Sequence, residues 1–523
     1  MSFIEQKDNQ SLPQATWTRK IVIPVIMAIM IIQFILLKSL YPFSNYMPSS
    51  YSYLETADMN LDINIWPVGY SKFLRFFSAF THSDTALTAF QYFFLTTCSL
   101  YFAFTTSRIF QLSKFAKVLL ITILVVNPLF LYVSNYVSPD ALFAGLSLLW
   151  FTQLLLLREK PHLSLLFSHL LTLFIVFTFA YHALYFPLLT IIVLLSTRQK
   201  KQVKLSGLVL IILSLGLYIV HVRHQYRQLT GAEHFAPVSG WLIASNAMAM
   251  YSNIAPEQKS PLPDRFLKLH QLLEGHEDSL QSTTIPKHTI NNNYYFNDSH
   301  SPLNQYLHIR LKADTLKGPS RSWVEAASLY SDYGWTLIRR YPYLYFRSIV
   351  VPGIEDFITP PVELLSVYNM DTDTVPKLTQ KWFNYKTSKI TSNDPDPVLV
   401  TLDLYPVIGT IIQFSFLTGL LIFILLKGLQ RANKAMRFLI WLYIVWWLFE
   451  FLLSVLTSTV TLRHQIFPAI MCLPATLFFM EFSIKTEWAA SQERKKILSI
   501  NFYAVRLSGK LTDKGKLKTF RKE

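Results

Sequence analysis

Long hydrophobic runs alternate along most of this chain with short polar or basic connectors. A helix needs about 20 apolar residues to cross the hydrocarbon core of a bilayer. Roughly ten runs approach or reach that length, at 21–38, 85–105, 118–134, 140–157, 163–180, 184–197, 205–222, 406–426, 437–458 and 465–482. The pattern predicts an all-α polytopic membrane protein with about 10 transmembrane helices.

One long segment breaks this pattern. Residues 223–405 are rich in Asn, Pro, His and Tyr and carry charges throughout. Helix starts are expected at Ser301-Pro302, where Ser can cap and Pro can occupy the first turn, and near Ser320. We therefore predict four parts: an N-terminal transmembrane module (1–222) with a first exterior loop at 39–84, a mostly helical exterior, periplasmic domain (223–405) inserted before the last three spans, those spans (406–482), and a basic cytoplasmic tail (483–523).

Composition and charge support the membrane assignment and narrow the partners. Of 523 residues, 51% are hydrophobic and 15% are charged, which is too apolar for an ordinary soluble domain. The formal net charge of +16 lies mostly in short connectors and in the C-terminal tail. This is the positive-inside distribution, so the charge indicates topology and contact with membrane lipids, with no nucleic-acid partner. We expect a multi-pass protein of the cell inner (plasma) membrane with both termini in the cytoplasm.

The fifth and sixth hydrophobic runs form a special pair. Only the stretch Ala180–Tyr185 separates them, and Pro187 follows at once. Proline removes a backbone donor and breaks a helix unless its neighbours compensate. The pair can be two spans or one kinked or re-entrant unit, and the basic tail favours the even count of spans.

The polar stretch from Met47 to Tyr70, MPSSYSYLETADMNLDINIWPVGY, lies beside the first span. Polar chemistry next to a bilayer calls for a functional explanation. Any single acid here can simply keep a turn solvated, and Trp and Tyr can belong to the interfacial aromatic belt. As a cluster, the stretch favours the front half of an active site whose aromatics bracket a sugar ring: Tyr53, Glu55, Asp58, Asp62, Trp66 and Tyr70.

A second polar loop, between the third and fourth runs, contains Tyr136, Ser138 and Asp140. Ser138 can cap the following helix, and Asp140 in its first turn suits the positive end of the helix dipole. Because this loop is predicted on the same side as the first, Asp140 can also orient an acceptor or coordinate a cation. Both interpretations of Asp140 stay open.

The order of these parts resembles the GT-C superfamily of integral membrane glycosyltransferases. The resemblance rests on the tyrosine-acid cluster of the first loop, the Pro67-x-Gly69-Tyr70 turn, and the segment Asn127-Pro128...Tyr132...Ser138-x-Asp140-x-x-Phe143, and it covers roughly the first two hundred residues. It implies a mannosyltransferase-like, inverting enzyme. Such an enzyme moves a sugar from a polyprenyl-phosphate carrier to a lipid, glycan or protein acceptor on the exterior face.

The chain departs from that pattern at one place. Many such enzymes carry an acidic pair in the first loop, followed by a Tyr and an Ala; Tyr53 and Ala57 match, but the pair falls on Ser49 and Ser50. Either Asp58 or Asp62 replaces the missing base, or the protein binds without turnover. The alternative function is therefore a non-enzymatic lipid-linked glycan transporter or a degenerate GT-C-like binding protein.

The expected chemistry assigns roles to these residues. A carboxylate must take the proton of the attacking hydroxyl, which we assign to Asp58 or Asp62 with Asp140 as its partner. The departing lipid phosphate needs a cation or donor, and the candidates are His182, Arg463 and His464. Glu450, within a predicted span, ranks below the loop acids. No cofactor or metal is assigned, although facing carboxylates would accept a divalent ion. The expected substrate-binding residues are Tyr53, Glu55, Trp66, Tyr70, Tyr136, His182, Arg463 and His464.

Overall fold

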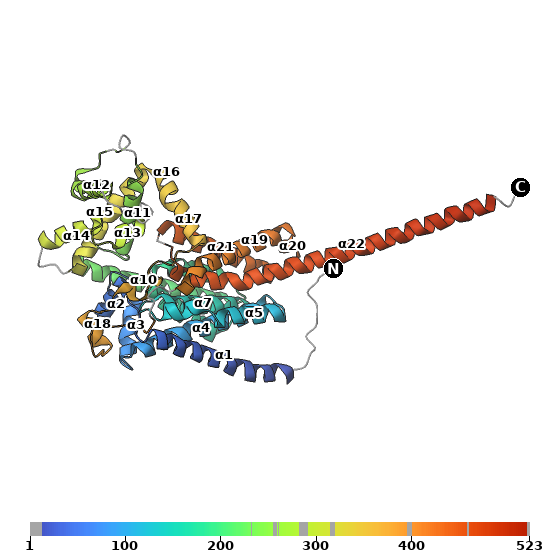
Figure 1. Ribbon diagram of the computed structural model, residues 1–523, viewed down its shortest axis with the longest axis horizontal. Coiled ribbons are helices and arrows are strands. Elements are labelled where there is room, and N and C mark those ends of the chain that lie inside the picture. The colour runs from blue at the N-terminus through green and yellow to red at the C-terminus, as the bar shows by residue number, and fades with distance from the viewer. Residues whose placement is uncertain are drawn as a thin grey trace.

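The computed structural model describes residues 13–231, 233–254, 259, 261–281, 291–313, 319–394, 400–457 and 460–519. Within these ranges the regular structure is helical, and pairing of extended chain is limited to two isolated bridges, Asn45 with Tyr136 and Thr374 with Lys389. Figure 1 shows a bundle of long helices, a group of shorter helices at one of its ends, and α22 extending away from the other. The predicted all-α class is confirmed.

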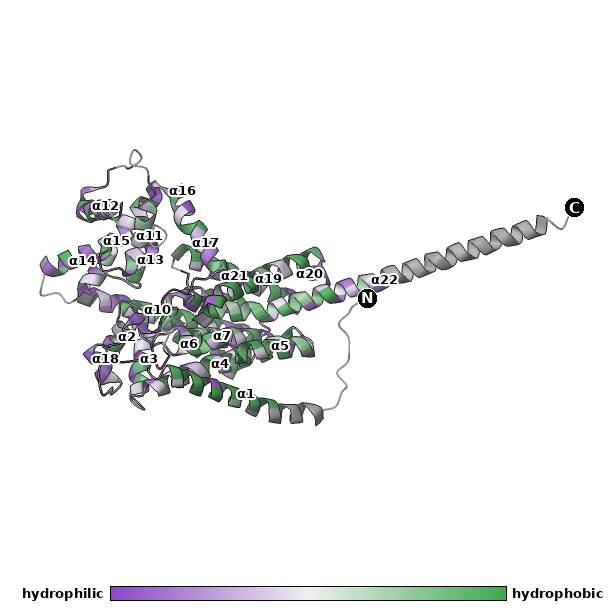
Figure 2. Ribbon diagram, viewed as in Figure 1, coloured by the Kyte–Doolittle hydropathy of each residue, from purple (hydrophilic) through white to green (hydrophobic). Residues whose placement is uncertain are grey.

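Among the described residues, eight segments are long and apolar enough to cross a membrane. Figure 2 shows hydrophobic residues along these helices and a more polar surface on the group of shorter helices. The segments are made by α1 (Pro13–Leu40), α4 (Asp84–Ile109), α5 with α6 (Lys114–Val125 and Pro128–Ser134), α7 (Asp140–Glu159), α10 (Lys201–Thr230), α19 (Tyr405–Leu425), α21 (Lys434–Thr457) and the first part of α22 (Ile466–Thr519).

The fifth and sixth predicted spans form two shorter apolar helices, α8 (Leu163–Phe179) and α9 (Phe186–Ser196). Ala180 between them is extended, with φ −154° and ψ 143°, and the short helix η1 (Tyr181–Tyr185) follows. Pro187 lies in the first turn of α9, where its missing N–H costs no helical hydrogen bond. Eight of the described segments thus reach full spanning length among the ten predicted runs, and the fifth and sixth runs are shorter helices on either side of the break.

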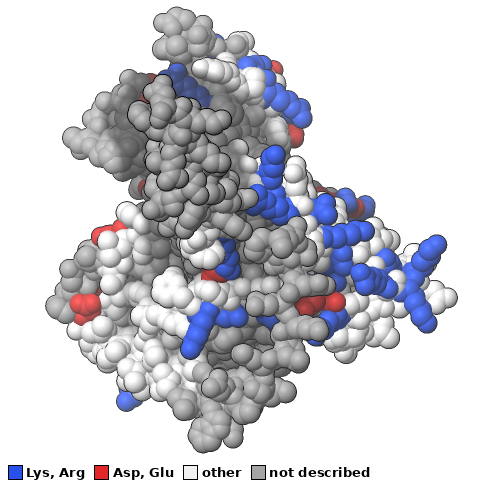
Figure 3. Space-filling view, turned by 90° about the vertical axis from the view of Figure 1, so that its right-hand side faces the viewer, with Lys and Arg blue, Asp and Glu red and all other residues white. Residues whose placement is uncertain are grey.

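Connectors predicted to lie on one side of the membrane meet at one end of the bundle. The Arg108 guanidinium is 2.6 Å from the Glu159 carboxylate, and the Ser113 backbone N–H donates to Glu481 over 3.0 Å. Arg158 lies over the ring of Phe438 at 5.0 Å. Figure 3, which looks onto the right-hand side of Figure 1, shows most of the visible Lys and Arg in the right half of the view. These contacts bring together three connectors that the sequence predicts on one side, and which side of the membrane they face stays a prediction.

The shorter helices at the opposite end form their own core. They are α11 (Val238–Tyr251), α12 (Leu267–Gln281), α13 (Asn292–Asn297), α14 (Pro302–Ala313) and α15 (Pro319–Arg340). Helices α11 and α15 approach closely because Gly240 has no side chain: a Cβ there would lie 2.1 Å from the Ala327 carbonyl oxygen. Trp241 and Trp323 stack beside this contact with centroids 4.6 Å apart. Both predicted helix starts, at Ser301-Pro302 and near Ser320, are confirmed.

The remainder of the segment 223–405 packs differently. Helices α16 (Pro342–Tyr345) and α17 (Val351–Ile358) lead back toward α21, and η6 (Glu363–Leu365), η7 (Tyr368–Asp371) and α18 (Lys377–Trp382) follow. This last stretch packs on the first exterior loop, which holds α2 (Pro48–Asp58) and α3 (Gly69–Ser78). The Tyr46 N–H donates to Asn369 over 3.1 Å, and Tyr385 donates to Asp84 over 2.9 Å. Residues 359–394 therefore join the main core, separately from α11–α15.

Candidate active site

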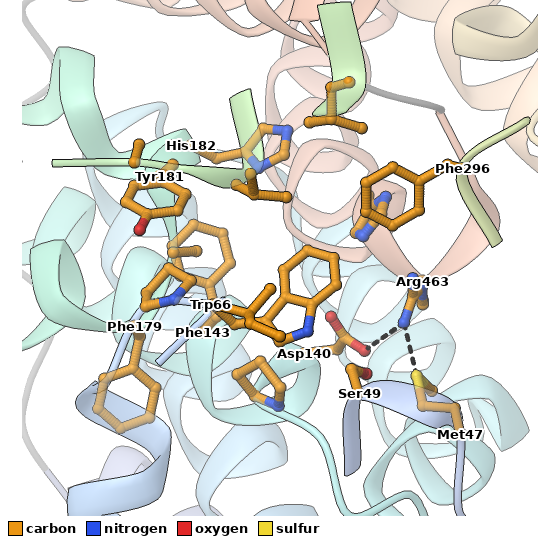
Figure 4. A pocket seen from close by; sticks show the side chains of 18 of the residues that line it. Met47, Ser49, Trp66, Asp140, Phe143, Phe179, Tyr181, His182, Phe296 and Arg463 are labelled. Atoms are coloured by element: carbon orange, nitrogen blue, oxygen red, sulfur yellow. Dashed lines mark hydrogen bonds and ion pairs between the residues drawn. The ribbon is translucent and has the colours of Figure 1, made fainter. Parts of the chain in front are cut away.

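A cavity of about 500 Å³ lies where the end of the bundle meets the shorter helices. The first loop and α2 form one wall, the break after α8 a second, the start of α7 and the short helix η9 (Leu462–Gln465) a third, and α11 and α13 the side facing the exterior domain. Figure 4 shows how the labelled side chains face this space. Residues from each of these segments line it, among them Met47, Ser49, Tyr53, Trp66, Asp140, Tyr181, His182, Val238, Asn293, Phe296, Glu363, Glu450, Arg463 and His464.

Asp140 and Arg463 form an ion pair in this wall. The Arg463 Nη1 is 3.5 Å from Asp140 Oδ2, and the two side chains are 22% and 13% exposed. The Ser138 hydroxyl donates to the same carboxylate over 2.9 Å. The predicted capping of α7 by Ser138 does not occur: the cap residue is Pro139, and the Ser138 hydroxyl holds the Asp140 carboxylate in place. Asp140 lies in the first turn, where the helix dipole also favours its charge.

Arg463 is positioned by backbone and sulfur contacts. The Leu462 N–H donates to the Pro361 carbonyl oxygen over 2.9 Å, which joins η9 to the exterior segment. Arg463 Nη1 also donates to the Met47 sulfur at 2.7 Å (Figure 4). Among the described residues, these contacts use one of the three guanidinium nitrogens. The other two guanidinium nitrogens of Arg463 keep N–H groups that can donate to an anion in the cavity.

Two histidines complete this side of the site. His182, from η1, and His464, from η9, have ring centroids 5.8 Å apart. The Nδ1 of His464 is 3.2 Å from the Thr461 hydroxyl. The structure therefore brings together Asp140, His182, Arg463 and His464, four residues predicted from three separate stretches of the chain. Because all four come from turns at the same end of the bundle, topology alone places them near one another.

The aromatic residues predicted for substrate binding divide into two groups. Tyr53 and Trp66 line the cavity, and the ring centroids of Trp66 and Phe296, which also lines it, are 5.9 Å apart. Burial, and then the nearby charge of Asp140, raises the pKa of Tyr53, so its phenol stays protonated and can donate a hydrogen bond. Tyr70 and Tyr136 are buried outside the cavity lining; Tyr70 packs against Tyr53 with centroids 5.2 Å apart. These two support the wall.

The structure does not bring the acids of the first loop into this cavity, and Asp58 and Asp62 do not lie with Asp140 in its wall. Glu55, Asp58 and Asp62 are exposed and do not line the cavity, and Asp62 pairs with Lys72 at 2.7 Å. The physical reason is that the loop contains helix α2. Most of its buried positions recur every three or four residues, and Glu55 and Asp58 lie on the exposed side of the helix. The buried residues of α2 are Ser50, Tyr53, Leu54, Thr56 and Ala57.

Two further carboxylates border the cavity. Glu450, which ranked below the loop acids, is 5% exposed and accepts a 2.6 Å hydrogen bond from the Tyr185 hydroxyl. Glu363 was not predicted at all. It comes from η6 of the exterior segment, and burial raises its pKa to about 7, with Asp356 adding to the effect and Arg463 opposing it. Its only sequence signal was an acid two residues after Pro360-Pro361, which carries no periodicity.

Among the described residues, no group of three or more His, Cys, Asp and Glu side chains has the arrangement needed to hold a metal ion. The chain was compared with protein-family models, with curated proteins and with solved structures, and none of them matches. The features that bear on function are therefore the membrane helices and the side chains that line this cavity.

Proposed function

We propose that the protein is a membrane glycosyltransferase that moves a sugar from a polyprenyl-phosphate carrier to a hydroxyl-bearing acceptor, with inversion. The observation that carries the proposal is the Asp140–Arg463 pair at 3.5 Å on the wall of a cavity at the end of the membrane helices. A lipid-linked sugar phosphate needs a site with these neighbours: hydrocarbon for the polyprenyl chain, a cation for the phosphate and polar groups for the sugar.

The reaction sets the roles. The acceptor oxygen attacks the anomeric carbon and its proton passes to a carboxylate, while the bond from that carbon to the phosphate oxygen breaks with its electron pair going to phosphate. Negative charge thus grows on the phosphate in the transition state. The available donors of Arg463 stabilise that charge, and Asp140 keeps the guanidinium oriented. His182 and His464, from adjacent walls of the cavity and with ring centroids 5.8 Å apart, serve the same anion.

The cavity also suits the donor in shape and sidedness. The segments that form it, around residues 47–67, 139–140, 180–184 and 463–464, all belong to the side predicted to be exterior by the basic connectors. Aromatic side chains cover much of the wall and offer faces for a sugar ring or a prenyl unit. They are Tyr53, Trp66, Phe143, Phe179, Tyr181 and Phe296.

The test is donor consumption by membranes that contain the full chain. A panel of radiolabelled polyprenyl-phosphate sugars, beginning with mannose, is offered with a membrane lipid and glycan extract as acceptor. We expect release of the sugar from its carrier, and a loss of about 100-fold or more in Arg463→Gln. Arg223→Gln removes an Arg that pairs with Glu233 away from the cavity, and it should leave the rate unchanged.

Two outcomes would overturn the proposal. One is binding of a labelled donor without any turnover by the wild-type protein, which would make it a binding protein. The other is equal turnover in Arg463→Gln and Arg223→Gln, which would remove the cavity from the reaction.

A further inference from the structure

Three carboxylates border the cavity, and their partners differ. Asp140 is held by Arg463 and Ser138, and Glu450 accepts a hydrogen bond from Tyr185 within the bundle. Glu363 reaches the cavity from the exterior segment. Among the described residues no ion pair engages it, and its side-chain hydrogen bond comes from the neutral amide of Asn293, at 3.3 Å. Glu450 also has a neutral donor, but Glu363 is the one of the three that faces the cavity beside the polar side chains of α13.

Asn293 fixes the direction of this carboxylate. Its own amide oxygen accepts a hydrogen bond from the Asn297 side chain one turn further along α13, which leaves its NH₂ group directed at Glu363 Oε2. A carboxylate has about four lone-pair sites, so this contact leaves acceptor capacity facing the cavity. Asn293 and Asn297 line the same wall, as does Ser239, and these polar groups suit an acceptor that carries hydroxyls.

The backbone of Glu363 is held in a conformation that side-chain-bearing residues seldom adopt. Its φ is 49°, in the left-handed region, which costs on the order of 1–2 kcal/mol for a residue other than glycine. Neighbouring hydrogen bonds hold it there: Ser366 N–H donates to the Glu363 carbonyl over 3.0 Å, and the Leu462 N–H donates to Pro361. The second bond places Glu363 and Arg463 on two segments that are joined directly.

We propose that Glu363 is the catalytic base of the glycosyl transfer described above, an inference that rests on that proposed function. The acceptor enters from the side of α13. Its hydroxyl proton moves to Glu363 as its oxygen bonds to the anomeric carbon, and the bond to the phosphate breaks toward Arg463. Protonated Glu363 then returns the proton to solvent. Ser49, which also lines the cavity, has no carboxylate to offer, so the exterior segment supplies the base that the first loop lacks.

The acidity of the group agrees with this role. A general base acts best when its pKa lies near the working pH. Burial raises the pKa of Glu363 to about 7; the charge of Asp356 on α17 raises it further, and that of Arg463 on η9 lowers it. Glu363 is therefore poised between its two protonation states near neutral pH.

The test uses Glu363→Ala and Glu363→Gln in the full chain, with Asp332→Asn as the control, because Asp332 pairs with Arg265 at 3.1 Å and lies outside the cavity lining. Transfer should fall about 100-fold or more in both Glu363 variants, with donor binding within about threefold of wild type. Azide is an anionic nucleophile that needs no base. It should restore donor cleavage in Glu363→Ala, with a glycosyl azide of inverted configuration as the product, and Asp332→Asn should transfer normally without it.

A purely structural role for Glu363 would give no rescue by azide, and that result in a variant that still binds donor overturns the assignment. Retention of more than about a tenth of the transfer rate in Glu363→Gln also overturns it. If the wild type and Glu363→Ala are both active while Arg463→Gln is not, only this inference fails. If the wild type consumes no donor, the proposed function itself fails.

Discussion

Two sets of carboxylates lie at the same end of this molecule, and their surroundings differ. Glu55, Asp58 and Asp62 are exposed on α2 and the turn after it, and Asp62 is paired with Lys72. Asp140 and Glu363 are half-buried on a cavity wall, and each has oriented polar neighbours. Water screens the first set and weakens its interactions, whereas burial strengthens those of the second. Clustering of acids in the sequence is thus a poor guide to which of them share a site.

The largest effect expected from this comparison belongs to Asp140. Asp140→Asn removes the charge opposite Arg463 but keeps the side-chain shape, so the guanidinium loses its orientation toward the phosphate. Transfer should fall about 100-fold or more, while donor binding changes less. The measurement is the rate of donor consumption at saturating donor. A rate within about twofold of wild type would mean that the pair is only structural.

The next effect concerns shape instead of charge. Gly69 begins α3, and a Cβ there would lie 2.6 Å from the Thr178 carbonyl oxygen, next to the break that lines the cavity. Gly69→Ala should push α3 away from α8 and cost about 1–3 kcal/mol of stability. Transfer should fall as well. Gly216 has open space around its Cα, so Gly216→Ala is the matched control for thermal unfolding and rate. Equal stability of the two variants would contradict the close approach.

Replacing Glu363 with glutamine should increase the stability of the folded protein at alkaline pH. Its pKa is raised to about 7, above the ordinary Glu value, so the folded state binds the proton more tightly than the unfolded state. The protonated carboxyl favours the folded state, and this contribution to the free energy of unfolding is complete below the pKa of an unfolded Glu. It is lost as the pH rises toward 7, where the buried carboxyl must become charged. Glu363→Gln removes that loss, and should be more stable than wild type by about 1–3 kcal/mol at pH 8 and equal to it near pH 4. Thermal unfolding at the two pH values measures this difference, and a variant less stable at pH 8 contradicts it.

The smallest effect is expected from the exposed acids. The triple variant Glu55→Gln, Asp58→Asn, Asp62→Asn should keep transfer within about twofold and lose at most about 1 kcal/mol of stability through the Lys72 pair. The hydrogen bond from Lys72 lowers the pKa of Asp62, so that pair contributes at neutral pH and is lost as pH falls through the lowered pKa. Unfolding with and without added salt measures it. A transfer loss approaching that of Asp140→Asn would restore the first loop as the source of the base.

The sequence predicts the parts of this fold that depend on local pattern. Hydrophobic run length locates the long membrane helices, and basic connectors predict which ends lie together, so Asp140 and Arg463 could be expected near one another. The direction of Glu55 and Asp58 was predictable in principle, because the apolar positions of α2 follow a helical period. The clustering of acids in this polar stretch masks that period, which becomes clear only once α2 is recognised as a helix.

Glu363 could not have been found in this way. It lies in a short non-periodic stretch, and it reaches the cavity only because residues 359–394 pack back onto the first loop across more than 300 positions of sequence, as in the hydrogen bond from Tyr46 to Asn369. Its raised pKa also depends on burial and on groups from two other elements, α17 and η9. Such features arise from tertiary packing, which no local pattern contains.

The packing of residues 359–394 against the first loop has a practical consequence. Severing the chain at the boundaries suggested by hydropathy, near 222 and 405, would strip Asn369 and Tyr385 from the membrane fragment and uncover Tyr46 and Asp84. The fragment made of residues 223–405 would in turn expose Leu365, Trp382 and Phe383, which are buried in the main core of the intact chain. Each fragment made alone should aggregate, and co-expression of the two is the arrangement in which a split version of the protein should assemble.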